Sequence, residues 1–357
     1  MKKLLMAASV ALAMGTSAPA SAVLIDFNGA AAGGVFNVGT LDWAPTNLFA
    51  LGGNTAITTF ASTPMAPGSA CPVGGCTFDV LVQARLIGAT TPGGAPIDFL
   101  GLGVEWTLTA RFTEVVTAVV PPPIAAAFFT TVTTAPGFLE VFFDSTPDAV
   151  DLTGHGFNNG RLILKGTSVG SADGNFDVNT TGTGIPPAPI QALDQNGAND
   201  YTGQMTVVGS GGNDNIPVDT LVQDFGFFLT QLDMFGILFA NISQGLPYVS
   251  VDPSKCFTPA VSGVAVGGTT GGMEPCDGSG HVNGLFSAQG ADPNGGLLPV
   301  IGSVNGLFGS MLSGPDFIAQ TDFNSPLRGV PEPGTLALLG AALGAIGFGL
   351  RRRKRTA

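Results

Sequence analysis

Three oxygen-bearing side chains, Asp173, Asn175 and Asp177, occupy alternate positions of the run DGNFD. In an extended chain alternate residues point to the same side, and carboxylate and amide oxygens are the ligands that calcium prefers. An EF-hand also needs a glycine and a glutamate, but its corresponding positions here hold Val178 and Gly184. Asp, Asn and Gly equally favour ordinary turns. The run therefore predicts either turn chemistry or a calcium site, and no other cofactor is indicated.

A second candidate is the run GTSVG, in which Ser168 stands at the centre of a G-x-S-x-G pattern. A hydrolase nucleophile elbow requires a helix directly after the serine. The residues that follow are turn-like, and the two histidines, His155 and His281, have no triad-like context. We therefore predict no catalytic residues and a protein that is not an enzyme.

The first 22 residues have the pattern of a secretory signal peptide. Two lysines precede an apolar stretch over residues 4–14, and Ala20 and Ala22 form a small-x-small cleavage site. The sequence therefore predicts a signal helix over residues 1–22 and an exported chain that begins near Val23.

The last 28 residues, 330–357, read as a sorting and anchor segment. An uncharged apolar run over residues 335–350 is followed by five basic residues at 351–355. As a helix this run extends about 24 Å, and thinning of the roughly 30 Å bilayer core makes a membrane helix possible. The basic residues hold that end in the cytoplasm. Just outside the run lies the expected sorting signal, Val330, Pro331, Glu332 and Pro333.

Four cysteines, Cys71, Cys76, Cys256 and Cys276, remain after export. An even number in an exported chain predicts disulfides, and we expect the pairs 71–76 and 256–276. The alternative is a zinc site of four thiolates, but only the first pair has the usual spacing.

Charge and composition exclude some classes of function. The chain has 13 basic and 25 acidic residues, of which 7 basic and 1 acidic lie in segments 1–22 and 332–357, leaving a net charge of −18. Nucleic-acid binding requires a basic surface, so it is not expected. With 53 Gly and 26 Pro the chain approaches low complexity, yet 25 Phe indicate a real core. Trp43 and Trp106 are candidates for sugar stacking, although burial is the commoner fate of tryptophan.

Alternation of polar and apolar residues dominates the exported part. It is clearest over residues 77–87 and 103–120, and Gly/Pro clusters separate the runs. No long helical pattern occurs between the termini. We predict an all-β fold over residues 23–256, a β-sandwich that is one large unit or two adjacent units with Gly-rich loops. Residues 257–329 are predicted to be a Gly-rich excursion and stalk.

The position of Pro331-Glu332-Pro333 before the apolar run resembles the PEP-CTERM domain of bacterial surface proteins. The resemblance implies that the membrane protease exosortase reads the tag and that the protein accompanies exopolysaccharide. Several stretches also resemble the flocculation-associated PEP-CTERM proteins of the PepA group; they are residues 42–47, 105–107, 112–116, 156–160 and 252–254.

We therefore expect an exported surface or matrix protein that promotes floc or biofilm aggregation. Its expected partners are exosortase, bacterial exopolysaccharide and, transiently, the inner membrane, with no nucleic acid. The alternative is a calcium-dependent secreted carbohydrate-binding module.

Overall fold

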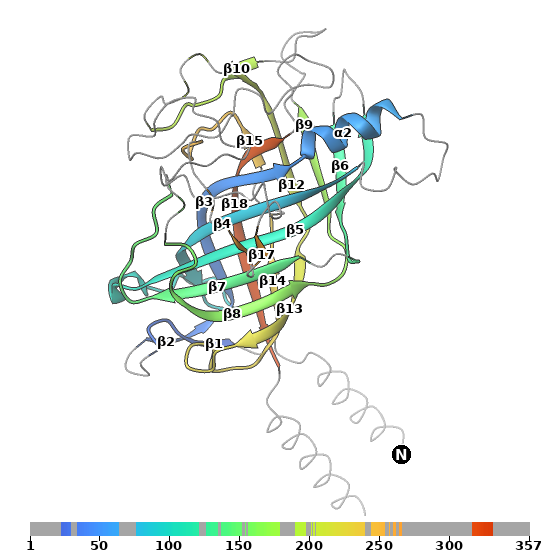
Figure 1. Ribbon diagram of the computed structural model, residues 1–357. Coiled ribbons are helices and arrows are strands. Elements are labelled where there is room, and N and C mark those ends of the chain that lie inside the picture. The colour runs from blue at the N-terminus through green and yellow to red at the C-terminus, as the bar shows by residue number, and fades with distance from the viewer. Residues whose placement is uncertain are drawn as a thin grey trace, which may run out of the picture.

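The computed structural model describes most of the chain between its two ends. The described residues are 23–29, 34–63, 76–120, 126–134, 137–151, 154, 156–178, 190–197, 201, 203, 205–239, 244–253, 257, 260–261, 264–265 and 316–330. They form an elongated body of antiparallel strands with one α-helix at its side (Figure 1).

The strands follow one another along the chain with few helical interruptions. They are β1 (Val23–Asp26), β2 (Val35–Val38), β3 (Thr40–Leu51), β4 (Thr77–Thr90), β5 (Glu105–Val120), β6 (Ala126–Thr131), β7 (Phe138–Asp144), β8 (Arg161–Ser168), β9 (Asp173–Val178), β10 (Ile190–Ala192), β11 (Met205–Val207), β12 (Gly209–Asn213), β13 (Ile216–Gln223), β14 (Leu232–Ile237), β15 (Gln244–Leu246), β16 (Ala260–Val261), β17 (Val264–Ala265) and β18 (Phe317–Gly329). The helices are α2 (Gly53–Ser62) and the short 3-10 helix η1 (Leu100–Leu102).

One sheet contains twelve of the strands, in the order β14-β13-β8-β7-β5-β4-β3-β18-β15-β12-β9-β6. Two further pairings, β14 with β18 and β5 with β6, make this sheet close on itself twice. Strands β3, β4, β5 and β18 belong to both closed parts. In Figure 1, β5, β7 and β8 cross in front of β18, and the apolar core fills the space that the sheet encloses.

The predicted all-β class is confirmed, but a sandwich of separate sheets is wrong, because the large strands belong to a single hydrogen-bonded sheet. Open sheets of more than about ten strands tend to curl or close. Bulges help the strands to bend, as where Thr220 and Val222 of β13 shift their register against β8.

The two strongest sequence patterns form the two longest strands, β4 and β5. Along β5 the side chains of Trp106, Leu108, Ala110 and Phe112 are all buried at alternate positions. This agrees with period-two alternation in a strand whose inner face meets the core. The outer face of β5 carries polar residues such as Thr109, which other segments of the chain cover.

Strand β18 differs from the sequence-based expectation of a stalk before the sorting segment. Residues 317–329 instead form a central strand that pairs with β3, β14 and β15. Its inward residues include Ala319 and Ser325, and the strand contains Pro326. Small, polar and proline residues weaken the hydrophobic alternation by which a strand is recognised.

Helix α2 also differs from the sequence-based expectation, which has no helical pattern between the termini. Gly52 at its N-cap has φ 79°, and no side chain at the cap accepts a hydrogen bond. The support comes from far along the chain, because Asp316 Oδ1 accepts the N–H of Gly52 at 2.7 Å. Asn54 Nδ2 also donates to the Asp316 carbonyl oxygen at 2.7 Å. This helix therefore depends on tertiary contacts.

No helix within the described ranges is long and apolar enough to cross a membrane. The predicted signal helix, residues 1–22, and the predicted membrane helix, residues 335–350, lie outside those ranges.

Both tryptophans are core residues and do not present a ring to a ligand. Trp106 is 2% exposed and lies 5.2 Å from the Phe27 ring, while Trp43 is fully buried and stacks near Phe323. Trp43 Nε1 donates to Ser325 Oγ at 2.9 Å, so β3 and β18 share a buried polar contact.

We predict that Ser325→Ala lowers the free energy of unfolding by about 1–3 kcal/mol, because it leaves the buried Trp43 N–H without an acceptor. In the double variant Trp43→Phe with Ser325→Ala the unpaired N–H is absent. The loss of unfolding free energy in the double variant should therefore be smaller than the sum of the two single losses. Urea denaturation measures both effects. Ser250→Ala is the matched control, since its hydroxyl bonds Gln320 at the exposed surface. Equal losses for Ser325→Ala and Ser250→Ala would contradict the assignment.

Candidate functional site

The sorting segment leaves the folded body directly from the sheet. Gly329, the last residue of β18, is opposite Leu232 of β14. The next residue, Val330, donates its backbone N–H to the Gln231 carbonyl oxygen at 2.8 Å. The other predicted signal residues, Pro331, Glu332 and Pro333, lie outside the described residues. No flexible spacer therefore separates the described sheet from the start of the signal.

The described N-terminal end lies at the same end of the body. Val23, the first residue of β1, is fully buried. Its neighbour Leu24 accepts the N–H of Leu229, which belongs to the loop between β13 and β14. The predicted cleavage residues Ala20 and Ala22 fall outside the described residues. Figure 1 shows β1 and the β13–β14 hairpin together at the lower end.

The predicted calcium ligands lie in strand β9 and not in a turn. Asp173, Asn175 and Asp177 share one face of this strand because their positions alternate. Asn175 Nδ2 donates to Asp177 Oδ2 at 3.0 Å. Among the described residues there is no group of three or more His, Cys, Asp or Glu side chains that could hold a metal ion.

An exposed aromatic ring lies beside these oxygens. Phe128 of β6 is opposite Asn175 and is 38% exposed, and Gly212 of β12 is opposite Asn175 on its other side. Gly212 has no side chain to cover this row, and the exposed Ser210 is opposite Asp177. We call the surface formed by these residues the outer strip; it consists of Phe128, Asp173, Asn175, Asp177, Ser210 and Gly212.

Strands β9 and β12 approach closely beside the outer strip. A Cβ added at Gly211 would overlap the Asn175 carbonyl oxygen, so a larger residue does not fit between β9 and β12 there. The strip offers a ring face for apolar contact and hydroxyl, amide and carboxylate groups for hydrogen bonds. This combination suits a polyhydroxylated ligand, whose C–H faces are apolar and whose hydroxyl groups donate and accept.

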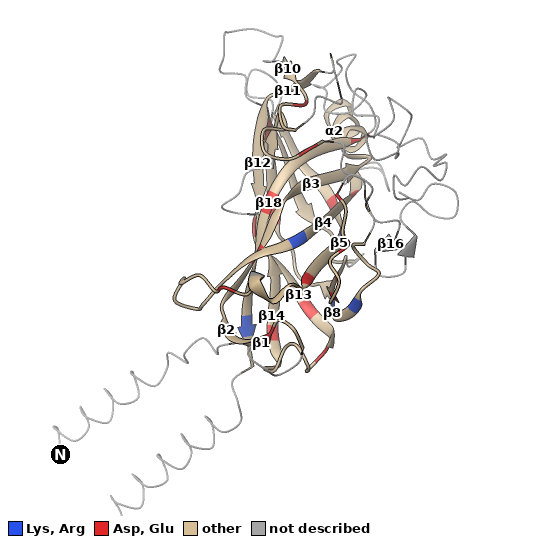
Figure 2. Cartoon of the chain, turned by 90° about the vertical axis from the view of Figure 1, so that its left-hand side faces the viewer, with Lys and Arg blue, Asp and Glu red and all other residues tan. Residues whose placement is uncertain are grey.

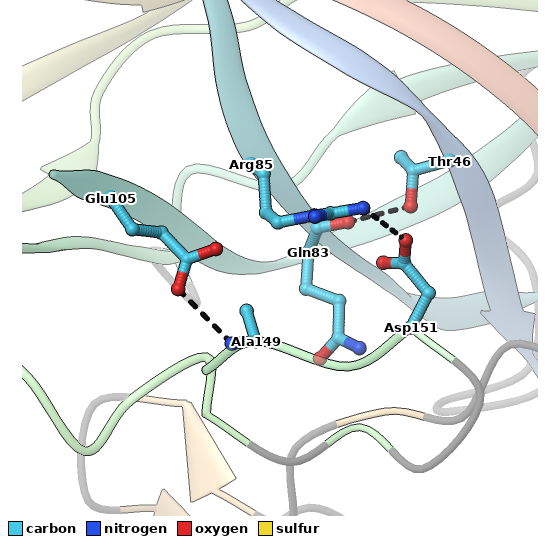
Figure 3. A network of polar contacts seen from close by, with 6 residues as sticks. All are labelled: Thr46, Gln83, Arg85, Glu105, Ala149 and Asp151. Carbon is cyan, nitrogen blue, oxygen red and sulfur yellow. Dashed lines mark hydrogen bonds and ion pairs between the residues drawn. The ribbon is translucent and has the colours of Figure 1, made fainter. Parts of the chain in front are cut away.

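A second polar cluster fixes a loop on the outer face of β4 and β5. Figure 3 shows Glu105 accepting the Ala149 N–H, at 3.0 Å, and Arg85 paired with Asp151 at 2.9 Å. The Arg85 and Asp151 side chains are 43% and 38% exposed, so solvent screening leaves this ion pair little net stabilising effect. The two backbone bonds to Glu105, from Asp148 and Ala149, hold the loop more firmly.

Two hydroxyl groups near this cluster donate to backbone carbonyl oxygens. Thr107 donates to the Phe157 carbonyl oxygen at 3.0 Å. Thr46 donates to the Gln83 carbonyl oxygen at 2.6 Å, beside the register shift in which β3 passes through Pro45 (Figure 3). Proline has no N–H, so the threonine hydroxyl replaces a missing ladder bond. These residues position loops and repair the sheet.

The Ser168 hydroxyl group takes part in a structural hydrogen bond. Gly137 donates its N–H to Ser168 Oγ at 2.7 Å, and the chain continues through a turn at Gly170 into strand β9. The helix that a nucleophile elbow requires does not follow the serine. His155 and His281 lie outside the described residues.

Cys76 is fully buried and disulfide-bonded. The other three cysteines, Cys71, Cys256 and Cys276, lie outside the described residues. The predicted pairs 71–76 and 256–276 therefore stay predictions.

Every basic residue in the described part of the chain is paired with a carboxylate. The pairs are Arg85–Asp151, Arg111–Asp79, Arg161–Asp224, Lys165–Glu140 and Arg328–Asp233. On the side of the body drawn in Figure 2, the blue and red segments are scattered over several strands. The described body therefore presents no cluster of unpaired basic groups to an anionic polymer.

Burial raises the pKa of several carboxyl groups, and that of Glu114 reaches the neutral range. Burial raises its pKa from 4.5 to about 7, and the 2.8 Å hydrogen bond from Asn213 Nδ2 opposes this shift. Burial also raises the pKa of Asp316. The pKa of Asp322 is raised by burial and by the nearby charge of Asp42. Sequence patterns did not reveal Glu114, since its partner is 99 positions away.

Residues 329–354 match the family model of the PEP-CTERM protein-sorting motif. This motif indicates sorting by exosortase, and it implies a secreted protein that is anchored transiently in the membrane before release to the surface. The match begins at Gly329, the last residue of β18. No curated protein and no solved structure matches the chain.

Glu114→Gln should change how stability depends on pH. In the folded protein the Glu114 carboxyl keeps its proton up to about pH 7, whereas in the unfolded chain it releases the proton near 4.5. Its contribution to stability is therefore present below pH about 4.5 and lost as pH rises to about 7. Glutamine stays neutral and can still accept from Asn213. We expect the variant to gain about 3 kcal/mol over the parent between these limits.

Urea denaturation of both proteins across this pH range measures the difference, and the remaining carboxyl groups are common to both. Parallel stability profiles for the parent and Glu114→Gln would show that Glu114 does not titrate in this range.

Replacing Pro331-Glu332-Pro333 by three alanines should block sorting, since the signal stands between the sheet and the apolar run. The variant is expected to stay in the inner membrane with its tail intact. Fractionation of cells, with mass spectrometry of the C-terminus, measures this outcome. Release of the variant with the same C-terminus as the parent protein would exclude the signal role.

Proposed function

We propose that this protein is a structural component of the bacterial surface that stays among exopolysaccharide and promotes floc or biofilm aggregation. The main support for this proposal is the PEP-CTERM motif, which follows the central strand β18 without a spacer. Proteins with this signal are delivered outside the cell, where such polymer accumulates. The likeness of several stretches to the PepA group supports the same role.

The outer strip is the surface that we propose for contact with polysaccharide. The exposed Phe128 ring provides an apolar platform, and Asp177 and Ser210 provide hydrogen-bonding groups beside it. With the described basic residues already paired, binding to neutral sugars is favoured over binding to anionic polymers. In this role the protein binds polymer and catalyses no reaction.

A calcium-dependent carbohydrate-binding module is the second candidate. It is supported by the shared face of Asp173, Asn175 and Asp177, whose oxygens suit a hard cation. In that case these three residues would hold calcium, and open coordination positions of the ion would accept sugar hydroxyl oxygens. The two candidates differ in whether a chelator abolishes binding.

Deleting the protein should reduce floc size while the amount of exopolysaccharide per cell is unchanged. The measurement compares the deletion strain with a strain complemented by the parent gene. Unchanged flocs would refute the role in aggregation. A fall in polysaccharide per cell would point instead to synthesis or export.

Phe128→Ala should weaken co-sedimentation of the full-length protein with purified exopolysaccharide, because it removes the ring platform. Phe225→Ala is the matched control, since Phe225 is 60% exposed at the other end of the body. The assay is run with calcium and with a chelator. If the parent protein binds in calcium and loses binding when the chelator is present, the calcium-dependent module is favoured. If Phe128→Ala and Phe225→Ala reduce binding equally, the outer strip is excluded as the binding surface.

A further inference from the structure

An apolar surface surrounds the exit point of the sorting segment. We call it the apolar tip; it consists of Leu24, Leu221, Val222, Phe225, Leu229 and Val330, whose side chains are between 37% and 60% exposed. Backbone bonds bring three of them together, because Leu229 donates to Leu24 and Val330 donates to Gln231 of the same loop. Phe225 belongs to this loop, and Leu221 and Val222 lie at the end of β13 that leads into it. Exposed apolar groups gathered in this way mark surfaces that contact another molecule or a membrane.

The local sequence alone does not explain why Phe225 and Leu229 face solvent. In the same loop Phe227 and Phe228 are buried, and Phe227 lies 5.9 Å from the Trp106 ring. The loop therefore has enough buried aromatic residues to fasten it to the core. Its other two large apolar side chains remain outside, beside the end of β18.

The chain length between the tip and the apolar run limits how far apart they can be. Only residues 331–334 separate Val330 from the run that begins at Thr335. Fully extended, the five steps from Val330 to Thr335 span at most about 18 Å, at roughly 3.5 Å each. The polar region of a bilayer leaflet is about 5–8 Å thick beyond the hydrocarbon core. A membrane-inserted tail therefore keeps the tip within roughly 10–13 Å of the bilayer surface.

The charges around the tip are compatible with this position. Asp224 is paired with Arg161, and Asp233 is paired with Arg328 at 2.6 Å. These acidic and basic groups balance each other beside the tip, whereas the exported chain as a whole is strongly acidic. A balanced, apolar surface can enter a lipid headgroup layer at lower electrostatic cost than the rest of the body.

We propose that the apolar tip docks on the lipid bilayer during the membrane-anchored stage, with Phe225 and Leu229 entering the interfacial layer. Docking holds the body against the membrane and sets Pro331-Glu332-Pro333 at a fixed depth. The proposal rests on the anchored stage that the sorting motif implies and is independent of the role in aggregation.

The test uses the full-length chain reconstituted through its tail into phosphatidylcholine vesicles with brominated acyl chains. Phe225→Trp places a fluorescent reporter on the tip, and Phe128→Trp, in the outer strip, is the matched control. Trp43 and Trp106 are buried and contribute the same background to both variants. We expect the emission of the reporter at position 225 to be strongly quenched and blue-shifted, and that of the control to be unaffected.

A second pair of changes tests the contribution of the tip itself. Leu221→Ser with Leu229→Ser, added to Phe225→Trp, should restore most of the emission while thermal unfolding shows that the body stays folded. Equal quenching at both reporter positions, or none at either, would overturn the proposal. Slower tail processing in cells by the serine variant, without lipid quenching, would also overturn it and indicate docking on a membrane protein.

Discussion

The pairing of β18 with β3 and β14 is the interaction on which the rest of the structure depends. Both closed parts of the sheet pass through β18, so neither can enclose its core before residues 317–329 are in place. The partners are far apart in sequence, as the Trp43–Ser325 bond over 282 positions illustrates. Such non-local closure is slow, because chain entropy is lost before contacts compensate for it. The same strand continues into the sorting segment, so the tail is joined to the most central part of the body.

A closed sheet also brings polar groups into its interior, where each needs a particular partner. Glu114 receives a bond from Asn213 across the enclosed space, and Thr131 accepts the Ala172 N–H at 2.7 Å. These contacts select one register, since a shift by one residue would separate every pair. They also carry a cost, because burial disfavours the ionised form of Glu114. The buried polar contacts thus favour one strand register, and through Glu114 they make the free energy of unfolding depend on pH.

The apolar tip and the outer strip lie toward opposite ends of the body. The termini of the described chain and the apolar tip lie at one end, while the outer strip on β6, β9 and β12 lies toward the other (Figure 1). A protein docked through the tip would therefore present the outer strip away from the membrane. The arrangement is consistent with a chain that is first held at a bilayer and then contacts polymer outside the cell.

Local patterns were sufficient for the sorting motif, the β class and the strands β4 and β5, because composition and period-two alternation act over a few neighbouring residues. They did not predict helix α2, whose start is held by Asp316, or strand β18, whose small residues and Pro326 weaken the alternation. The single closed sheet, the Glu114–Asn213 contact and the placement of Phe128 beside Asn175 were decided by tertiary structure. Each depends on which distant strands become neighbours, and that choice is made by closure and packing of the whole sheet.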